Sequence, residues 1–290
     1  MSKKTYLMES TTEIERLEIK TRGQDVAEQA RWAGIRPGHR VADIGCGSGK
    51  TSFHLWRLVQ PDGAVVGIDA SAERVAHARR KYACPGLSFT CRDFLEPMDD
   101  MGGFDFVWIR FVLEFYRSQG TAIVRRAYEM LKPGGILCLV DLDHNCLNHH
   151  GLSPALSRAL AGVMADLERR SEFDPYAGRK LYAHLYDLGM GAIRVAMRPH
   201  HLIYGKLGEI DRFNWEQKMR VAVNRSAYRF ESDYPDGADG FCREFQRFFS
   251  DPRRFTYTPM ILCRGRKPWP SVDEADQAAG AAGAVPPGAA

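Results

Sequence analysis

The chain has 290 residues, a length that fits one large α/β domain or two smaller domains. Apolar residues make up 44%, enough for a full core, and the formal net charge of only +4 is spread over both halves, which gives no basic face for nucleic acid. The seven cysteines form no Cys-x-x-Cys pair, so they indicate neither a zinc site nor a disulfide framework. With no apolar run of membrane-spanning length and no apolar segment at the start, we expect a cytoplasmic protein.

The first 22 residues are predicted to form a polar N-terminal arm. Ser10 or Thr11 is a suitable cap for a first short helix with a narrow apolar face. A second helix is predicted over 24–34, where Gly34 ends it, and the Arg36-Pro37-Gly38 turn then leads into the first strand.

Residues 41–51, VADIGCGSGKT, are the most informative stretch of the chain. The apolar run ends at Asp43 and reads as a buried parallel strand, and a glycine turn then opens a helix near Lys50. Glycine is needed in such a turn because the backbone bends sharply and a ligand approaches it where a Cβ would stand. The free N–H groups at the start of the helix face the same place.

Two common phosphate-binding signatures do not fit this turn. A P-loop that ends in Gly49-Lys50-Thr51 would need its first glycine at position 44, which is Ile44. A dinucleotide fingerprint would need its third glycine at Lys50. The remaining pattern is Asp-x-Gly-x-Gly-x-Gly over residues 43–49, and a glycine turn without a ligand is the alternative.

This pattern resembles the first motif of class I S-adenosylmethionine-dependent methyltransferases. Over roughly residues 25–265, the resemblance implies an α/β, Rossmann-like sheet of seven mainly parallel strands, with the last strand antiparallel and helices on both faces. It also implies S-adenosyl-L-methionine as cofactor, bound around Asp43, Gly45, Cys46, Gly47 and Gly49.

The next two strands are predicted over 64–69 and 87–91, with helices over 50–59 and 72–82. Asp69, followed by Ala70, ends the first of these strands and is placed to accept both ribose hydroxyls, although it could instead cap the helix that follows. After the second strand, the family places an acid on the adenine amino group and an apolar neighbour on the ring. Asp93 and Phe94 occupy these positions, and a plain surface turn is the alternative.

A fourth buried strand is predicted over 104–110, and in the family the following segment, 112–116, lines the methyl-donor end of the cofactor. Arg110 is also predicted to bind the cofactor. As a charged residue at the end of an apolar strand, it either reaches a carboxylate or extends to solvent. Tyr6 and Arg16 resemble the pair that closes over the cofactor in many small methyltransferases. Arg16 could instead pair with a neighbouring acid.

A helix over 119–131 and a fifth strand over 135–141 lead to the segment 141–150, DLDHNCLNHH. Its histidines and acids invite a metal site, but no Glu-x-x-His or paired-histidine helical spacing is present, so no metal is predicted. Because histidine titrates near neutral pH, we expect His144, with Asp141, to handle a proton as catalytic residues.

Helices are predicted over 155–170 and 178–188, and strands near 191–198 and 256–264. The segment 200–252 between these strands is too long for a loop, so it is predicted as a helical insertion whose aromatic residues cover the acceptor. The methyltransferase domain then spans residues 23–268, and residues 269–290 form a disordered alanine, glycine and proline tail.

The predicted function is methyl transfer from S-adenosylmethionine to a small-molecule acceptor, by in-line displacement at the sulfonium methyl group. Methylation of RNA or protein would call for a basic face or a single-strand channel. A binding module that keeps the cofactor without turnover would show the same glycine turn. The sequence leaves open the acceptor, the methylated atom and whether the chain forms oligomers.

Overall fold

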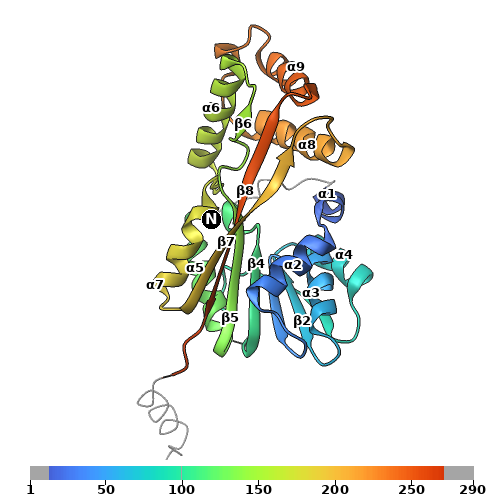
Figure 1. Cartoon of the computed structure of the whole chain (residues 1–290), viewed down its shortest axis with the longest axis vertical. Helices are drawn as coiled ribbons and strands as arrows, with labels where there is room; N and C mark the ends of the chain where they lie inside the picture. The colour runs from blue at the N-terminus through green and yellow to red at the C-terminus, as the bar shows by residue number, and fades with distance from the viewer. Residues whose placement is uncertain (1–12, 99, 271–290) are drawn as a thin grey trace, which may run out of the picture.

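The computed structural model describes residues 13–98 and 100–270, and its centre is one mixed sheet (Figure 1). The strand order is β3-β2-β1-β4-β5-β8-β6, and β7 pairs with β8. The first five strands are parallel, whereas β8 runs antiparallel to β5, β6 and β7. The bounds are β1 (Arg40–Ile44), β2 (Ala64–Asp69), β3 (Leu87–Cys91), β4 (Phe104–Arg110), β5 (Leu131–Leu142), β6 (His149–His150), β7 (Gly191–Ile203) and β8 (Phe255–Arg266).

Helices cover both faces of this sheet, as predicted. One apolar cluster joins the sheet to one set of helices, namely α2 (Gly23–Ala33), α3 (Lys50–Val59) and α4 (Ala72–Tyr82). A second cluster joins the other face to α5 (Gly120–Glu129) and α7 (Leu181–Asp187). Local signals fix the ends of these helices: Gly34 ends α2 with a φ of 102°, and the Ser71 side chain caps α4 by accepting from the Arg74 N–H.

The sheet differs from the prediction at three places. β5 begins at Leu131 rather than at residue 135, because Leu131 already pairs with Phe104 before the register shifts. β7 continues to Ile203, beyond the predicted end at residue 198. The two-residue strand β6 adds an eighth member, since His149 and His150 pair with the start of β8.

The insertion before the last strand is helical. It begins after Ile203 rather than at residue 200, and it contains α8 (Glu209–Arg225) and α9 (Gly237–Ser250). These helices pack with α6 (Pro154–Arg170) in a third apolar cluster, which includes Trp215, Phe241 and Phe245. We call α6, α8 and α9 the helical lobe. It lies at the top of Figure 1, at the ends of the long strands β7 and β8.

The first helix, α1 (Glu13–Lys20), lies between this lobe and the lower helices (Figure 1). It contacts α8 of the lobe. None of the helices in the described part of the chain combines the length and the apolar character that a membrane span requires. Most of the predicted tail lies outside the described residues.

His149 connects the sheet to the helical lobe through a neutral ring. Its Nε2 donates to the carbonyl of Cys146 (3.1 Å), so its Nδ1 accepts from the hydroxyl of Thr256 (2.8 Å). The ring packs edge-on against Trp215, with the centroids 5.3 Å apart. Burial lowers the pKa of His149 to about 4.

Acid should therefore weaken the docking of the lobe. A histidine with a lower pKa in the folded than in the unfolded chain opposes folding once the pH falls below about 6.5, and the effect grows until the folded pKa is reached. Between pH 7 and pH 5 the native protein should lose about 1–2 kcal/mol of unfolding free energy through His149. Urea unfolding of His149→Phe should show a smaller loss between these pH values than the native protein or the exposed His150→Phe control. Equal losses in all three would contradict the prediction.

Candidate functional site

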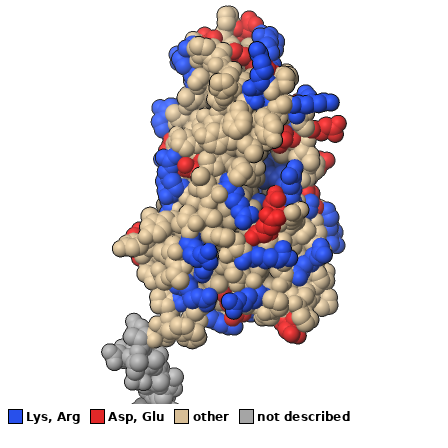
Figure 2. All heavy atoms as spheres, in the orientation of Figure 1, with Lys and Arg blue, Asp and Glu red and all other residues tan. Residues whose placement is uncertain are grey.

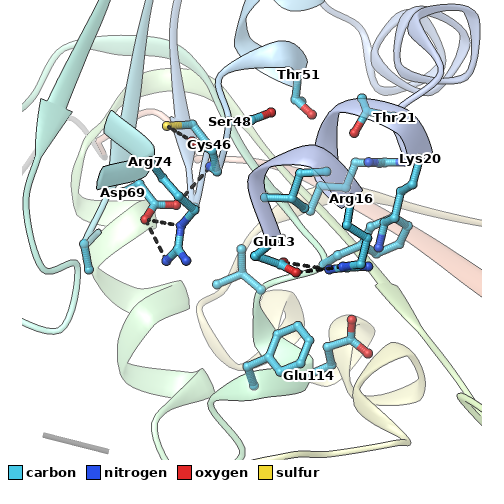
Figure 3. Close-up of a pocket in the computed structure, with 18 of the residues that line it drawn as sticks. Glu13, Arg16, Lys20, Thr21, Cys46, Ser48, Thr51, Asp69, Arg74 and Glu114 are labelled. Carbon is cyan, nitrogen blue, oxygen red and sulfur yellow. Dashed lines mark hydrogen bonds and ion pairs between the residues drawn. The ribbon is translucent and has the colours of Figure 1, made fainter. Parts of the chain in front are cut away.

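A pocket opens at the carboxyl ends of β1, β2 and β4, where α1 lies over the glycine turn (Figure 3). Its wall includes Cys46 and Asp69 on one side and Arg16 and Lys20 of α1 on the opposite side, with Glu114 below them in the view. We call it the first pocket. It lies at the edge of the sheet where open α/β folds bind their ligands.

The three glycines of the turn serve different purposes. All three have a positive φ, 74° at Gly45, 55° at Gly47 and 87° at Gly49. A Cβ on Gly45 would lie 2.3 Å from the Val112 side chain, and one on Gly47 would lie 2.9 Å from Leu17 of α1. Gly45, Cys46 and Gly47 line the pocket, whereas Gly49 faces the core and begins α3. The turn therefore holds α1 close on one side and the ends of the strands on the other.

Asp69 lies at the carboxyl end of β2 and lines the pocket together with Ala70. Its Oδ1 accepts from the Ser71 N–H and from Arg74, while its Oδ2 accepts from the Gly47 N–H (2.9 Å). A carboxylate oxygen can accept two hydrogen bonds, so Oδ2 has capacity for a ligand hydroxyl. The cap of α4 is the Ser71 side chain, which leaves Asp69 on the pocket side.

Two of the predicted acids do not line this pocket. Asp43 lies under the turn, where its Oδ2 accepts from the Ser52 hydroxyl (2.6 Å) and burial raises its pKa to about 7. Asp93 accepts from the Leu95 N–H, as an acid in a surface turn does. The neighbouring Phe94 does line the pocket and is buried, so one member of the predicted adenine pair faces it.

The predicted closing arm is described only in part, because Tyr6 lies outside the described residues. Arg16 lines the pocket and donates two hydrogen bonds of 2.7 Å to Glu13, so it pairs with a neighbouring acid, which was the alternative considered for it. Elsewhere on α1, Glu18 accepts from Lys81 (2.5 Å) and from the Tyr82 hydroxyl (2.7 Å) of α4. Although burial alone would raise it, these hydrogen bonds hold the pKa of Glu18 below its usual range.

Arg110 follows neither of the alternatives considered for it. Its Nε donates to the amide oxygen of Gln29 (3.0 Å), and its guanidinium lies 4.1 Å from the centroid of the Phe111 ring. Phe111 has a φ of 58°, an uncommon backbone for a bulky residue and one that is often found at functional sites. The Lys20 ammonium lies 5.0 Å from the centroid of the same ring, so two cations contact Phe111 at the wall of the pocket.

A second pocket lies between the first pocket and the helical lobe. Arg16, Lys20, Glu114 and Phe115 line both pockets, so we call them the junction. On the far side, the second pocket is bounded by the lobe and the loop after β5, including Met164, Leu167, Asn214, Lys218 and Asn145. A molecule in the second pocket would therefore meet a molecule in the first at the junction.

The two predicted catalytic residues are not among those that line the described pockets. Asp141 is fully buried behind the junction, where its Oδ2 accepts from the Glu114 N–H (3.1 Å). His144 packs edge-on against Tyr176. Positive φ values at His144 (48°) and Cys146 (66°) bend the loop so that Asn145 turns inward, and Asn145 donates to Glu114 Oε2 (2.7 Å).

The junction contains buried charges that the sequence interpretation did not select. Burial raises the pKa of the Glu114 carboxyl. Burial, followed by the nearby Arg16, lowers the pKa of Lys20 to about 7. The sequence held one signal that Glu114 occupies a special position, because it is the single acid in the apolar segment VLEFY. Lys20 lies in a polar helix, and no sequence signal distinguishes it.

The loop with several histidines does not gather metal ligands. Among residues 13–98 and 100–270, no group of three or more His, Cys, Asp or Glu side chains is placed to hold a metal ion. His149 bonds to Thr256 and to a carbonyl, as described above, and His144 packs on Tyr176.

Comparison with known proteins agrees with this geometry. Residues 41–135 match a family model described as a methyltransferase domain. Trans-aconitate 2-methyltransferase of Deinococcus radiodurans is 28% identical over 163 residues, which cover 55% of this chain and 60% of the relative. The 2-phytyl-1,4-naphtoquinone methyltransferase of Synechocystis is 41% identical over 120 residues, which cover 40% of this chain and 50% of the relative. The chain thus spans less than two thirds of the length of either relative.

Among solved structures, the phosphoethanolamine N-methyltransferase 2 of Haemonchus contortus, in complex with phosphomonomethylethanolamine and S-adenosylhomocysteine, superimposes with a TM-score of 0.56. The match covers 91% of this chain and 60% of that one at 18% sequence identity, so it shows the fold alone. Residues 41–135 are thus similar to a methyltransferase domain, and the strand order and the glycine turn agree with the fold of the solved methyltransferase.

Proposed function

We propose that this protein transfers a methyl group from S-adenosylmethionine to a small-molecule acceptor. The observation that carries the proposal is the pair of adjoining pockets, which share the junction residues Arg16, Lys20, Glu114 and Phe115. The first pocket would hold the methyl donor and the second the acceptor. The two substrates would then meet within one enclosed site, which is what a direct transfer requires.

The residues of the first pocket suit the parts of S-adenosylmethionine. Asp69 has an acceptor oxygen for a ribose hydroxyl, and buried Phe94 offers a flat apolar surface for adenine. The Arg16–Glu13 pair supplies one charge of each sign for the amino and carboxylate groups of the methionine end. When bound, the donor supplies a sulfonium methyl group that is already activated, so the protein mainly aligns the acceptor.

If the acceptor must lose a proton, we propose Glu114 as the group that accepts it. Glu114 faces both pockets, and its raised pKa brings proton transfer closer to neutral pH than an ordinary carboxylate would allow. Asn145 and Asp141 orient it, one by donating to its side chain and the other by accepting from its backbone N–H. In this proposal His144 has no direct contact with the acceptor.

Two alternative functions remain to be distinguished by experiment. Figure 2 shows Lys and Arg side chains in separate groups on this face, interspersed with Asp and Glu, rather than in the continuous basic surface that an RNA substrate favours. A protein that binds the donor without turnover would have the same first pocket. To distinguish these functions, the protein is incubated with a whole-cell extract and S-adenosylmethionine that carries a deuterated methyl group. The small-molecule, RNA and protein fractions are then analysed by mass spectrometry. Labelled small molecules support the proposal, and labelled RNA or protein alone would refute it.

The donor assignment predicts a specific loss in Asp69→Asn. Removing the charge weakens the acceptor for the ribose hydroxyl, so the dissociation constant for S-adenosylhomocysteine should rise at least tenfold by calorimetry. Asp62→Asn, a change in an exposed turn, should bind like the native protein. Unchanged affinity in Asp69→Asn, or tighter binding of ATP or NAD than of S-adenosylhomocysteine by the native protein, would rule out the assignment.

The ties between α1 and α4 predict that α1 controls donor release. Glu18→Ala removes the hydrogen bonds from Lys81 and Tyr82, so α1 should lift more often and S-adenosylhomocysteine should dissociate several-fold faster in stopped-flow experiments. Glu15→Ala, an exposed change on the same helix, is the matched control. If both variants release the ligand at the native rate, α1 is not a lid over the donor.

The role of Glu114 predicts separate effects on binding and on turnover. Glu114→Gln keeps the shape and the contact with Asn145, so affinity for S-adenosylhomocysteine should stay within a factor of about two, while turnover on the acceptor found above should fall by about 10²-fold or more. The native rate should drop as the pH falls through the raised pKa of Glu114. Exposed Glu129→Gln is the control. Native turnover in Glu114→Gln would show that orientation alone carries the reaction.

A further inference from the structure

Two helices each present a pair of polar side chains to the second pocket. On α1, Arg16 and Lys20 are four residues apart, and on α8, Asn214 and Lys218 are also four apart. Residues at this spacing lie on the same face of a helix. Because α1 contacts α8, the two pairs meet where the arm of the chain touches the helical lobe.

Among residues 13–98 and 100–270, neither lysine forms an ion pair, although the charge of the nearby Glu114 carboxylate acts on both. The Lys218 ammonium donates to Asn145 Oδ1 (3.1 Å) and lies 4.5 Å from the centroid of the Trp215 ring. Lys20 lies over the Phe111 ring. Within the described residues, no carboxylate comes within ion-pair distance of Lys20 or Lys218, whereas the guanidinium of Arg16 is held by Glu13.

Asn214 adds an independent sign of a missing ligand. Its side chain is only 7% exposed and lines the second pocket, yet its amide oxygen has no hydrogen-bond partner among the described residues. Buried amides are normally satisfied, and the two ends of an asparagine amide exchange by a simple flip. The N–H₂ end of Asn214 can therefore serve as a donor next to Lys218.

We propose that the acceptor carries a carboxylate, which binds between Lys20 of α1 and the Lys218–Asn214 pair of α8. The apolar remainder of the acceptor would lie against Phe115, Met164 and Leu167, which line the same pocket. This inference rests on the proposed function, because it treats the second pocket as the acceptor site. It assigns a substrate class that the methyltransferase fold does not specify.

The charges favour a carboxylate over a phosphate. Burial and the nearby Arg16 lower the pKa of Lys20 even though Glu114 acts in the opposite direction, so one further negative charge would stabilise its ammonium. The second pocket also contains Glu114, and a doubly charged phosphate would be repelled more strongly by that carboxylate. Arg16, the side chain best shaped to hold a phosphate, is already bound by Glu13.

The test compares small aromatic probes that differ in charge. The full-length protein is saturated with S-adenosylhomocysteine and titrated by calorimetry with 3-phenylpropanoate, 3-phenylpropan-1-ol, 3-phenylpropylamine and phenyl phosphate. The dissociation constant of 3-phenylpropanoate should be at least tenfold lower than those of the alcohol and the amine, and lower than that of the phosphate. The dissociation constant of 3-phenylpropanoate should also rise with added salt, because the attraction is between charges.

Variants then locate the interaction. Lys218→Met should raise the dissociation constant of 3-phenylpropanoate at least tenfold and leave that of the alcohol unchanged. Asn214→Leu should raise it several-fold. Arg220→Met removes a cation from the exposed side of the same helix and should bind the carboxylate like the native protein. Affinity for S-adenosylhomocysteine should be the same in all variants.

The outcomes separate this inference from the proposed function. Failure of the native protein to bind S-adenosylhomocysteine would refute the donor assignment, whatever the probes do. If S-adenosylhomocysteine binds normally, three results would each refute the carboxylate inference alone. These are no binding of 3-phenylpropanoate, binding no tighter than that of the alcohol, the amine or the phosphate, and equal binding to Lys218→Met.

Discussion

The pairing of β7 with β8 beyond the end of β5 determines where the rest of the site lies. β5 pairs with β8 only between Arg266 and Met260, while β7 follows β8 back to Thr256. This two-stranded extension carries the chain past the carboxyl edge of the sheet and holds the helical lobe above it (Figure 1). The lobe has its own aromatic core and does not need to pack flat on the sheet, which leaves room for a pocket between the two.

Helix α1 fills part of that room and connects the two substrate regions. An isolated helix of eight residues is marginal in water, so α1 depends on its tertiary contacts. Leu17 packs on Gly47, Glu18 is held by α4, and the opposite side contacts α8. Its polar side chains thereby face both pockets. In our proposal the same helix covers the donor and supplies a cation for the acceptor, so both substrates stabilise its position.

The junction shows how a fold can hold charged groups in a largely apolar region. Glu114 keeps two oriented contacts, from Asn145 and to Asp141, while Lys20 lies over the Phe111 ring and near the Glu114 charge. Buried charge of this kind costs stability, and proteins often accept that cost where a ligand or a reaction uses it. Phe111 and Cys146, which both have a positive φ, line the two pockets that meet at the junction, and such backbones often occur at functional sites.

The sequence by itself determined the parallel sheet, the glycine turn with Cys46 and the position of Asp69 at a strand end, because local pattern and spacing specify buried strands and glycine turns. Phe94 was expected at the pocket from the family resemblance. It also indicated a helical insertion before the last strand, although this insertion begins after Ile203 rather than at residue 200. The tertiary structure decided the rest. Asp43 and Arg110 bond to Ser52 and Gln29, and the loop after β5 offers Asn145 instead of His144. Lys20 and Lys218 line the same pocket although they are far apart in the sequence. Their placement depends on how α1 packs against the lobe, which no local pattern records.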